Sequence, residues 1–377
     1  MTATPPSSPV LPAPPDGAAI AGEGYIVHGL RVSYFTRKVT GYLDHKRQPW
    51  WLRPSLGINR DARVLGWNGG IPVVTTPDGE MIWDSTSIIV HLETVLREHA
   101  VQPADPALRF LDFLLDDFSD EWFYRHAVGA RWLYDENVVA GSLDIAREAL
   151  HETGAGLDQT RAFATDAMTG CLVRLGTTPE NIEAWVLDSL KPWQRAFGAH
   201  AQEHGYLLGA RPSLADFAFF GGNAAHFVND PVCVRWSEES PGVLQHTNAL
   251  LTAREQHDGD WFDVDALPES LFAVLAEAGR HYLPWVARAT IDGEAVVEFE
   301  SGAHARIATT NFLTTARGVM LARYVDARSA SLDAILERAG ILRWYADYVD
   351  QATSVPDPQP VPRPSDNRPY PAGPGGG

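Results

Sequence analysis

The alternation of strand and helix patterns between residues 25 and 99 is the feature that most constrains the fold. It is clearest at 69–83, where two β-forming runs flank Pro77-Asp78-Gly79 and predict a hairpin. The predicted elements are a strand at 25–30, an amphipathic helix at 34–46, a short or edge strand at 49–55, a short helix or turn at 58–67, the hairpin, and a helix at 84–99. This order predicts a compact α/β unit.

Later in the chain the apolar spacing becomes helical. Apolar residues recur at intervals of three and four and predict one long helix through Leu108, Leu111, Leu115, Phe118 and Trp122. Further helices are predicted at about 145–175, 180–204, 213–228, 242–255, 268–280 and 330–352. Turn residues at Asp292-Gly293 and Ser301-Gly302 predict a small hairpin within 289–308.

Both ends of the chain differ in composition from the middle. Residues 1–23 and 354–377 are rich in proline and small residues, so we expect two disordered tails. Between them we predict an α/β domain at 24–100, a helical domain at 101–285, and an extension of one hairpin and one helix at 286–353.

Charge and composition exclude several classes of partner. The formal charge of −18, from 48 acidic and 30 basic side chains, repels phosphate backbones and anionic lipids, so we expect neither nucleic acid nor membrane partners. No apolar run is long enough to span a bilayer, and no secretory signal is evident at the N-terminus, so the expected location is cytoplasmic. Two cysteines cannot form a disulfide framework or a zinc knuckle.

Ser33 lies between the first predicted strand and the following helix. A serine at this position caps the helix by accepting a backbone N–H. The same helix start also favours an anion, so the hydroxyl could instead hold an ionised thiol. The residues leave both interpretations open.

Two further turns combine a structural and a binding interpretation. Pro72 starts a strand after Ile71, either as an ordinary trans proline or as a cis proline that leaves neighbouring backbone groups free for a peptide-like ligand. Asp84 and Ser85 precede a helix and either cap it or help its N-terminus bind a carboxylate.

One further sequence pattern is a folding signal, and the motifs of metal-dependent and nucleotide-dependent enzymes are absent. Ser213 and Asp216 have the spacing of a reciprocal capping box, with Asp in place of the usual Glu, which is a folding signal. No sequence pattern typical of metal-dependent or nucleotide-dependent enzymes occurs, so no metal is expected.

Four stretches resemble the glutathione S-transferase superfamily over about 25–260. In chain order they are SYFTRKV, GGIPVV with PDGEMIWDSTSII, DFSDEWFYRHAVGARW, and RPSLADF. The resemblance implies an α/β thioredoxin-like N-terminal domain that binds glutathione, followed by an all-α glutathione-transferase-type C-terminal domain. The C-terminal extension with its β-hairpin makes the chain longer than the common two-domain plan.

The resemblance also implies roles for individual residues. Ser33 corresponds to the thiol-activating hydroxyl, and Tyr34, which replaces the usual proline, could itself reach into the site. Thr36 occupies the second position of the thioredoxin-like redox pair; because neither position is cysteine, disulfide chemistry is disfavoured. The remaining implied contacts to glutathione are the Ile71 backbone with a cis Pro72, Asp84 and Ser85 for the γ-glutamyl end, and Arg53, Arg60 or Arg63 for the glycyl carboxylate.

An acceptor site is expected between the domains, with a structural role as the alternative for each residue. The candidates are Trp122, Tyr124, His126, Arg131 and Trp132. The implied function is a glutathione S-transferase that conjugates the thiolate to an electrophilic apolar small molecule, in detoxification. A glutathione-dependent lyase, dehalogenase or isomerase and a non-catalytic binding or scaffold protein are the alternatives. Glutathione is the expected co-substrate, and a homodimer is left open.

Overall fold

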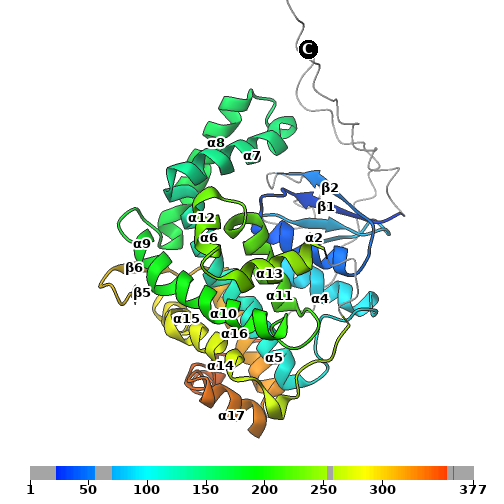
Figure 1. The fold of residues 1–377 in the computed structure, drawn as a ribbon, viewed down its shortest axis with the longest axis vertical. Coiled ribbons are helices and arrows are strands. Elements are labelled where there is room, and N and C mark those ends of the chain that lie inside the picture. Colours follow the sequence, from blue (N-terminus) through cyan, green and yellow to red (C-terminus); the bar gives the residue numbers. More distant parts are fainter. Residues whose placement is uncertain (1–22, 56–69, 253–257, 355–359, 361–377) are drawn as a thin grey trace, which may run out of the picture.

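The computed structural model describes residues 23–55, 70–252, 258–354 and 360. Its N-terminal domain contains a four-stranded sheet in the order β2-β1-β3-β4, with α2 and α4 packed against it (Figure 1). The elements are β1 (Tyr25–Gly29), α2 (Tyr34–His45), β2 (Trp50–Pro54), β3 (Val73–Thr75), β4 (Met81–Trp83) and α4 (Ser85–Val95). The predicted α/β unit is thus confirmed.

The sheet is mixed, and its register follows from the connections. β2 runs parallel to β1 at the edge of the sheet, while β3 and β4 form the antiparallel hairpin. The edge position of β2 agrees with its prolines, which cannot donate to a central ladder. The short helix or turn predicted at 58–67 lies outside the described residues.

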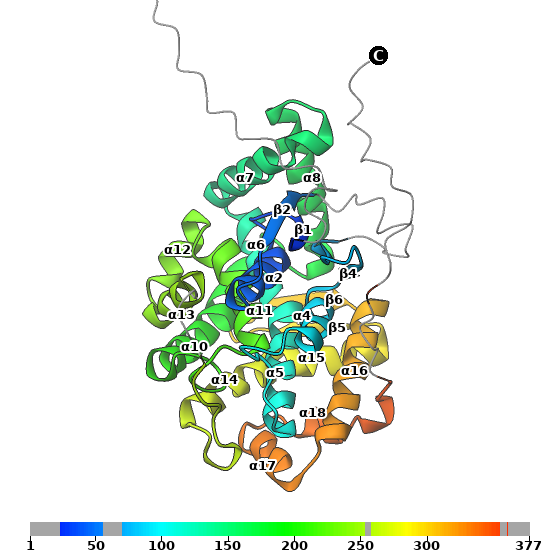
Figure 2. The same cartoon turned by 90° about the vertical axis from the view of Figure 1, so that its right-hand side faces the viewer.

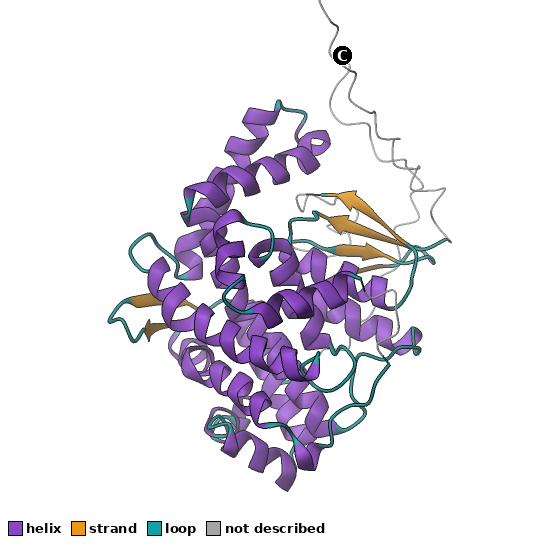
Figure 3. Cartoon of the chain, viewed as in Figure 1, coloured by secondary structure: helices purple, strands orange, loops and turns teal. Residues whose placement is uncertain are grey.

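Helices make up nearly all of the remaining described chain (Figure 3). In order they are α5 (Pro106–Phe118), the π-turn η1 (Ser119–Phe123), α6 (Tyr124–Leu133), α7 (Asp135–Thr153), α8 (Leu157–Leu175), α9 (Ile182–Ala184), η2 (Trp185–Leu190), α10 (Lys191–His204), α11 (Leu214–Gly222), η3 (Asn223–Phe227), α12 (Pro231–Ser237), α13 (Pro241–Leu251), η4 (Val264–Ala266), α14 (Glu269–Glu277), η5 (Ala278–Tyr282) and α15 (Leu283–Asp292). Then follow β5 (Glu294–Glu298), β6 (His304–Ala308), α16 (Asn311–Ala327), α17 (Ala330–Arg338), α18 (Arg343–Ala346) and η6 (Val349–Gln351). The α/β domain, the helical domain and the later hairpin confirm the predicted fold class.

Several predicted boundaries were wrong. The single helix predicted at about 145–175 is the antiparallel pair α7 and α8, which starts at Asp135 and turns at Gly154, a residue with φ of +62°. The helices α12 and α16 were not predicted. α16 has no apolar stripe because polar and apolar residues are spread all around it, so helical periodicity could not reveal it.

α2 packs tightly against α11, which joins the two domains. A Cβ at Gly221 would lie 2.6 Å from the carbonyl oxygen of Tyr34, so only glycine permits this approach. The start of α11 is fixed by the predicted capping box, in which the Asp216 carboxylate accepts the N–H of Ser213 at 2.8 Å. His246 also donates to this fully buried carboxylate, at 2.8 Å.

The C-terminal extension packs on the first long helix. Phe110 on α5 lies 5.0 Å, centroid to centroid, from Tyr345 and 5.8 Å from Tyr324, and all three rings are buried. Figure 2 shows α16 and α18 beside the helical domain. The boundary proposed between 285 and 286 falls inside α15, and the extension contains three α-helices rather than one.

No helix among the described residues is long and apolar enough to cross a membrane. Within the same residues, no group of three or more His, Cys, Asp or Glu side chains is arranged to hold a metal ion.

We expect Tyr345→Ala to destabilise the whole protein by about 3–5 kcal/mol, because it leaves a cavity against Phe110 and Tyr324. Phe312→Ala, at a side chain that is 60% exposed, should change the free energy of unfolding by less than about 0.5 kcal/mol. Urea denaturation followed by circular dichroism measures both. A separate early transition, with the main transition unmoved, would show that the extension folds on its own.

Candidate active site

The strand register brings three of the predicted segments together where β1 and β4 end and β3 begins. This line of strand ends is called the sheet edge below. Val73 on β3 lies opposite both His28 on β1 and Trp83 on β4. Pro72 directly precedes Val73, the helix α2 starts a few residues beyond β1, and α4 starts directly after β4. The N-termini of two helices and the proline turn therefore meet at this edge.

Ser33 is the N-cap of α2. Its backbone is extended, and its Oγ accepts the N–H of Thr36 at 3.4 Å, which is a long hydrogen bond. Among the described residues, the Ser33 hydroxyl hydrogen has no acceptor, and neither do the N–H groups of Tyr34 and Phe35. This helix start thus keeps donors available for an anion.

The proline turn has the predicted geometry. The Ile71–Pro72 peptide bond is cis, and it follows Gly70, whose φ of +104° is accessible to glycine. Ile71 is half-buried and packs against an apolar cluster that includes Leu30 and Val32. The turn is therefore held close to the segment that leads into Ser33.

The start of α4 combines a cap with an unusual backbone. Asp84 has a φ of +70°, which is rare for a residue other than glycine and is typical of functional positions. Its carboxylate accepts the N–H of Ser87 at 2.9 Å. Within the described chain, the N–H groups of Ser85 and Thr86 have no acceptor, so the helix can bind a carboxylate.

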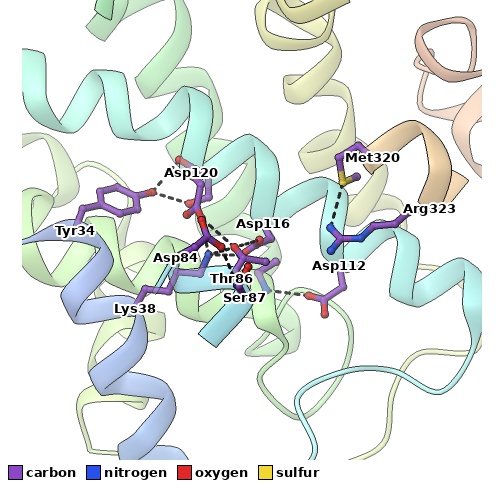
Figure 4. Close-up of polar contacts among 12 residues, drawn as sticks. Tyr34, Lys38, Asp84, Thr86, Ser87, Asp112, Asp116, Asp120, Met320 and Arg323 are labelled. Atoms are coloured by element: carbon purple, nitrogen blue, oxygen red, sulfur yellow. Dashed lines mark hydrogen bonds and ion pairs between the residues drawn. The ribbon is translucent and has the colours of Figure 1, made fainter. Parts of the chain in front are cut away.

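Tyr34 does not lie at this edge. Its side chain is 1% exposed and extends from α2 toward the helical domain (Figure 4), where its hydroxyl bonds the Ser119 hydroxyl at 2.6 Å and the Ser119 carbonyl at 3.1 Å. Burial raises the pKa of Tyr34 well above its ordinary value. The hydroxyl is therefore occupied in joining the domains, which corrects the expectation that it reaches into the site.

The side chains of Thr36 and Arg53 have other neighbours than Ser33 in the structure. Thr36 is buried against Gly29, where a Cβ would be 2.3 Å from the Thr36 Oγ1, and this oxygen has no hydrogen-bond partner among the described residues. Arg53 lies on β2 directly opposite His28. The alternatives Arg60 and Arg63 fall outside the described residues.

Trp122 and His126 are inside the helical domain. Trp122 is 1% exposed, packs on Trp185 and donates its indole N–H to Ser189 at 3.0 Å. His126 is 2% exposed, and burial lowers its pKa to about 3. Neither side chain presents an open face to a substrate, because each is enclosed by other rings.

Arg131 holds the segment before Ser33. Its Nη1 donates to the Val32 carbonyl at 2.8 Å, its Nη2 donates to the Ala225 carbonyl, and its guanidinium forms an ion pair with Asp230 at 2.9 Å. The side chain is 2% exposed. Arg131 therefore positions the backbone next to Ser33 and is not available to a substrate.

Tyr124 is the acceptor candidate that remains partly open. It is half-buried, its ring lies 5.0 Å from that of Phe35 on α2, and it packs against the same apolar cluster as Ile71. Its hydroxyl has no partner among the described residues, and burial raises its pKa to about 12. The remaining candidate, Trp132, is buried in that cluster.

A buried ion cluster behind the two helix starts was not predicted. The ammonium of Lys38 on α2 lies 2.6 Å from carboxylate oxygens of both Asp116 and Asp120, and it donates to Thr86 on α4 at 2.9 Å (Figure 4). Thr86 donates in turn to Asp116 at 2.8 Å. Lys38 has no exposed side-chain surface. This cluster links α2, α4 and the first long helix.

Charge in this cluster is unbalanced. Burial lowers the pKa of Lys38, but attraction from Asp116 and Asp120 outweighs it, so the pKa lies above its ordinary value and the ammonium stays charged. Burial raises the pKa of Asp120 well above its ordinary value, and Lys38 offsets this only in part. Lys38 is thus the shared ion-pair partner of two carboxyl groups, and it favours the ionised form of Asp120 against the effect of burial.

The sequence did contain a signal for the cluster. Asp112, Asp116 and Asp120 recur every fourth residue on a mostly apolar helix, which places them on one face. Acidic residues repeated on a buried face need a basic partner, and Lys38 occupies the Arg/Lys position of the SYFTRKV stretch.

Comparison with known families identifies the N-terminal domain. Residues 32–95 match the family described as glutathione S-transferase, N-terminal domain. No protein of established annotation matches the chain.

Solved structures with similar folds include several glutathione S-transferases. A Rhodospirillum rubrum F11 glutathione S-transferase is 18% identical, with 66% of this chain and 97% of that chain covered and a TM-score of 0.39. The β-etherase LigF from Sphingobium sp. strain SYK-6 is 16% identical, with 61% and 95% covered and a TM-score of 0.43. A glutathione S-transferase from Methylobacterium radiotolerans, in complex with glutathione sulfonate, is 17% identical, with 60% and 90% covered and a TM-score of 0.33.

Lys38→Met should destabilise the protein by about 3–5 kcal/mol, because it leaves two buried carboxylates without their counter-ion. The matched control is Lys191→Met, which removes an exposed pair with Glu239 and should cost less than about 1 kcal/mol. Urea denaturation at pH 7 measures both. Adding Asp120→Asn to Lys38→Met should restore part of the loss. Equal losses for the two lysine variants would contradict the assigned role.

Buried neutral histidines should make stability depend on pH. Burial lowers the pKa of His126 to about 3 and that of His226 to about 4, whereas both residues bind protons near pH 6.5 when unfolded. The unfolded state then holds more protons, so this contribution to stability is lost as the pH falls from about 6.5 toward 3. His126→Gln should therefore reduce the slope of unfolding free energy against pH by up to about 1.4 kcal/mol per pH unit.

The measurement compares urea denaturation of the wild type and His126→Gln at several pH values from 7 to 4. The diagnostic quantity is the difference in slope between wild type and variant. The wild-type slope alone is not diagnostic, because burial raises the pKa of Asp117 to about 6 and that of Glu121 to about 7, and these carboxyl groups make stability rise as the pH falls. Parallel curves for wild type and His126→Gln would show that His126 binds its proton over the same pH range in the folded and the unfolded protein, which would contradict the prediction.

Proposed function

We propose that this chain, which belongs to the glutathione S-transferase superfamily, binds glutathione at the sheet edge formed by Ser33, Pro72 and Ser85 and ionises its thiol there. The observation that carries the proposal is the strand register, which brings two helix N-termini and a cis-proline turn together. Each of these elements supplies a type of contact that a charged tripeptide thiol requires.

Ser33 holds the thiolate in this proposal. Its hydroxyl hydrogen is free among the described residues, and the unbonded N–H groups of Tyr34 and Phe35 add positive potential at the same helix start. Each unit by which the thiol pKa falls corresponds to about 1.4 kcal/mol of thiolate stabilisation. Tyr34 acts through its backbone, since its hydroxyl is bound to Ser119.

The rest of the tripeptide is assigned to the neighbouring turns. The backbone of Ile71, before the cis Pro72, pairs with the cysteinyl unit. The γ-glutamyl carboxylate binds the N–H groups at the start of α4, next to Ser85, and Asp84 faces the ammonium group. Arg53 at the end of β2 is assigned to the glycyl carboxylate.

The reaction proposed is transfer of the thiolate to an electrophilic apolar molecule. The sulfur forms a bond to carbon while the leaving group departs with its electron pair, and the thiol proton goes to solvent. Tyr124, half-buried beside α2, is the acceptor-side residue that the geometry favours. Lyase, dehalogenase or isomerase chemistry would begin from the same thiolate. A cytoplasmic location, a homodimer and a role in detoxification stay predictions.

A binding or scaffold protein is the second candidate, and one observation favours it. The acceptor-site residues Trp122, His126 and Arg131 are each no more than 3% exposed, so the chain presents little of the acceptor surface that was expected. In that case Ser33 only caps α2.

Glutathione titrated into the wild-type protein in a calorimeter should bind at millimolar concentration or below. The pH dependence of the thiolate ultraviolet absorbance should give a bound thiol pKa lower than that of free glutathione. Ser33→Ala should raise this pKa by about one unit, because the thiolate loses a hydrogen bond worth about 1.5 kcal/mol. This readout needs no knowledge of the acceptor.

Ser329→Ala is the matched control. Ser329 caps α17 through a 3.2 Å bond from the N–H of Leu332, far from the site in sequence and exposed. Both variants should lose about 1 kcal/mol of stability, but only Ser33→Ala should shift the thiol pKa. Absence of glutathione binding would reject the transferase, and it would also reject the lyase, dehalogenase or isomerase that starts from the same thiolate. Binding with an unchanged thiol pKa in Ser33→Ala would favour the binding protein.

A further inference from the structure

A pocket of about 580 Å³ lies in the C-terminal part of the chain. It is formed by η5, α15, the β5–β6 hairpin and α18, all beyond residues 32–95 that match the family. Its size is within the range of small-molecule sites. The residues that line it are Arg280, His281, Pro284, Trp285, Arg288, Asp292, Glu294, Ala295, Val296, Val297, Glu298, Arg306, Arg343 and Trp344.

The pocket gathers guanidinium groups in a chain whose net charge is −18. Two of its four arginines are neutralised: Arg306 pairs with Glu294 at 2.5 Å, and Arg280 pairs with Glu277 at 2.9 Å. Among the described residues, Arg288 and Arg343 have neither an ion pair nor a side-chain hydrogen bond. These two guanidinium groups are therefore the free donors of the pocket.

Arg343 is held in a geometry that suits an anion. Its guanidinium lies over the ring of Trp344, 4.4 Å from the centroid. This contact is to the π-system of the ring and uses none of the guanidinium N–H donors in a hydrogen bond, so they can bind a carboxylate or phosphate. Arg288, on α15, lines the same pocket, and α15 contacts α18.

Apolar side chains also line the pocket, among charged ones. Pro284, Val296 and Trp344 supply a surface on which a flat ring can lie, and Val296 is 38% exposed. Asp292 and Glu298 also line the pocket and have no partner among the described residues. They would repel an anion, so the position of the charged group depends on the two free arginines.

We propose that this pocket binds a small aromatic anion, a phosphate or carboxylate group attached to a planar ring. Arg288 and Arg343 bind the anionic group, and the ring lies against Pro284, Val296 and Trp344. The site is separate from the sheet edge where glutathione is proposed to bind, and it would serve a second ligand whether or not the chain is a transferase.

The test uses 1-naphthyl phosphate, 1-naphthoate and uncharged 1-naphthol as probes in isothermal titration of the full chain. At least one anion should bind, and the stronger of the two identifies the group that the pocket prefers. Naphthol should bind at least about tenfold more weakly, because it cannot form charge-assisted hydrogen bonds. The double variant Arg288→Gln/Arg343→Gln should weaken anion binding by about tenfold or more.

Two matched variants sharpen the result. Arg97→Gln, an exposed arginine outside the pocket, should bind the anion as the wild type does. Asp292→Asn/Glu298→Gln removes two negative charges from the lining and should tighten anion binding several-fold. Weaker binding by this variant would overturn the proposal, since it would show that the pocket selects a cationic or zwitterionic group.

Two other results would also overturn it: naphthol binding as tightly as the anions, or the double arginine variant binding like Arg97→Gln. Unfolding midpoints check that every variant is folded. Should the double variant be unstable, the salt dependence of wild-type binding decides. Affinity for the anion should fall with added salt, and a salt-independent affinity would contradict binding through the arginines.

Discussion

The arrangement of the two domains depends on the buried ion pairs of Lys38 with Asp116 and Asp120. Charges without exposed surface are tolerated only when they are paired and hydrogen-bonded, so the elements that carry them must keep one relative position. Lys38 comes from α2 and its partner Thr86 from α4, the same two helices whose N-termini form the candidate site. Lys38 and Thr86 therefore fix the relative position of the two helix N-termini at the sheet edge.

The α/β domain could be predicted because its signals are local. Pro77-Asp78-Gly79 specifies a turn, Ser33 and Asp84 are cap residues, and the strand lengths then bring their neighbours to one edge. The cis bond at Pro72 came from the family resemblance and is present. What the sequence could not supply is the direction in which each side chain near that edge points.

Tyr34 shows why. Next to Ser33 in sequence, it faces a different partner because successive helical residues are about 100° apart. The π-turn at 119–123 presents both the hydroxyl and the carbonyl of Ser119 to it, and a π-turn gives no periodic signal of its own. Trp122 and His126 were misjudged for a related reason: polar and aromatic residues on a helix between domains can equally face the interior.

Arg131 has a consequence for motion. Its planar guanidinium is bound at once to the Val32 carbonyl, to the Ala225 carbonyl and to Asp230, so it spans both domains with no freedom to rotate. Because Arg131, Ala225 and Asp230 all belong to the helical domain, a hinge opening of one domain from the other would break the bond to Val32. The Lys38 ion pairs cross the same boundary, and together with the Arg131–Val32 bond they oppose such an opening. We therefore expect ligand exchange at the sheet edge to proceed by small local displacements.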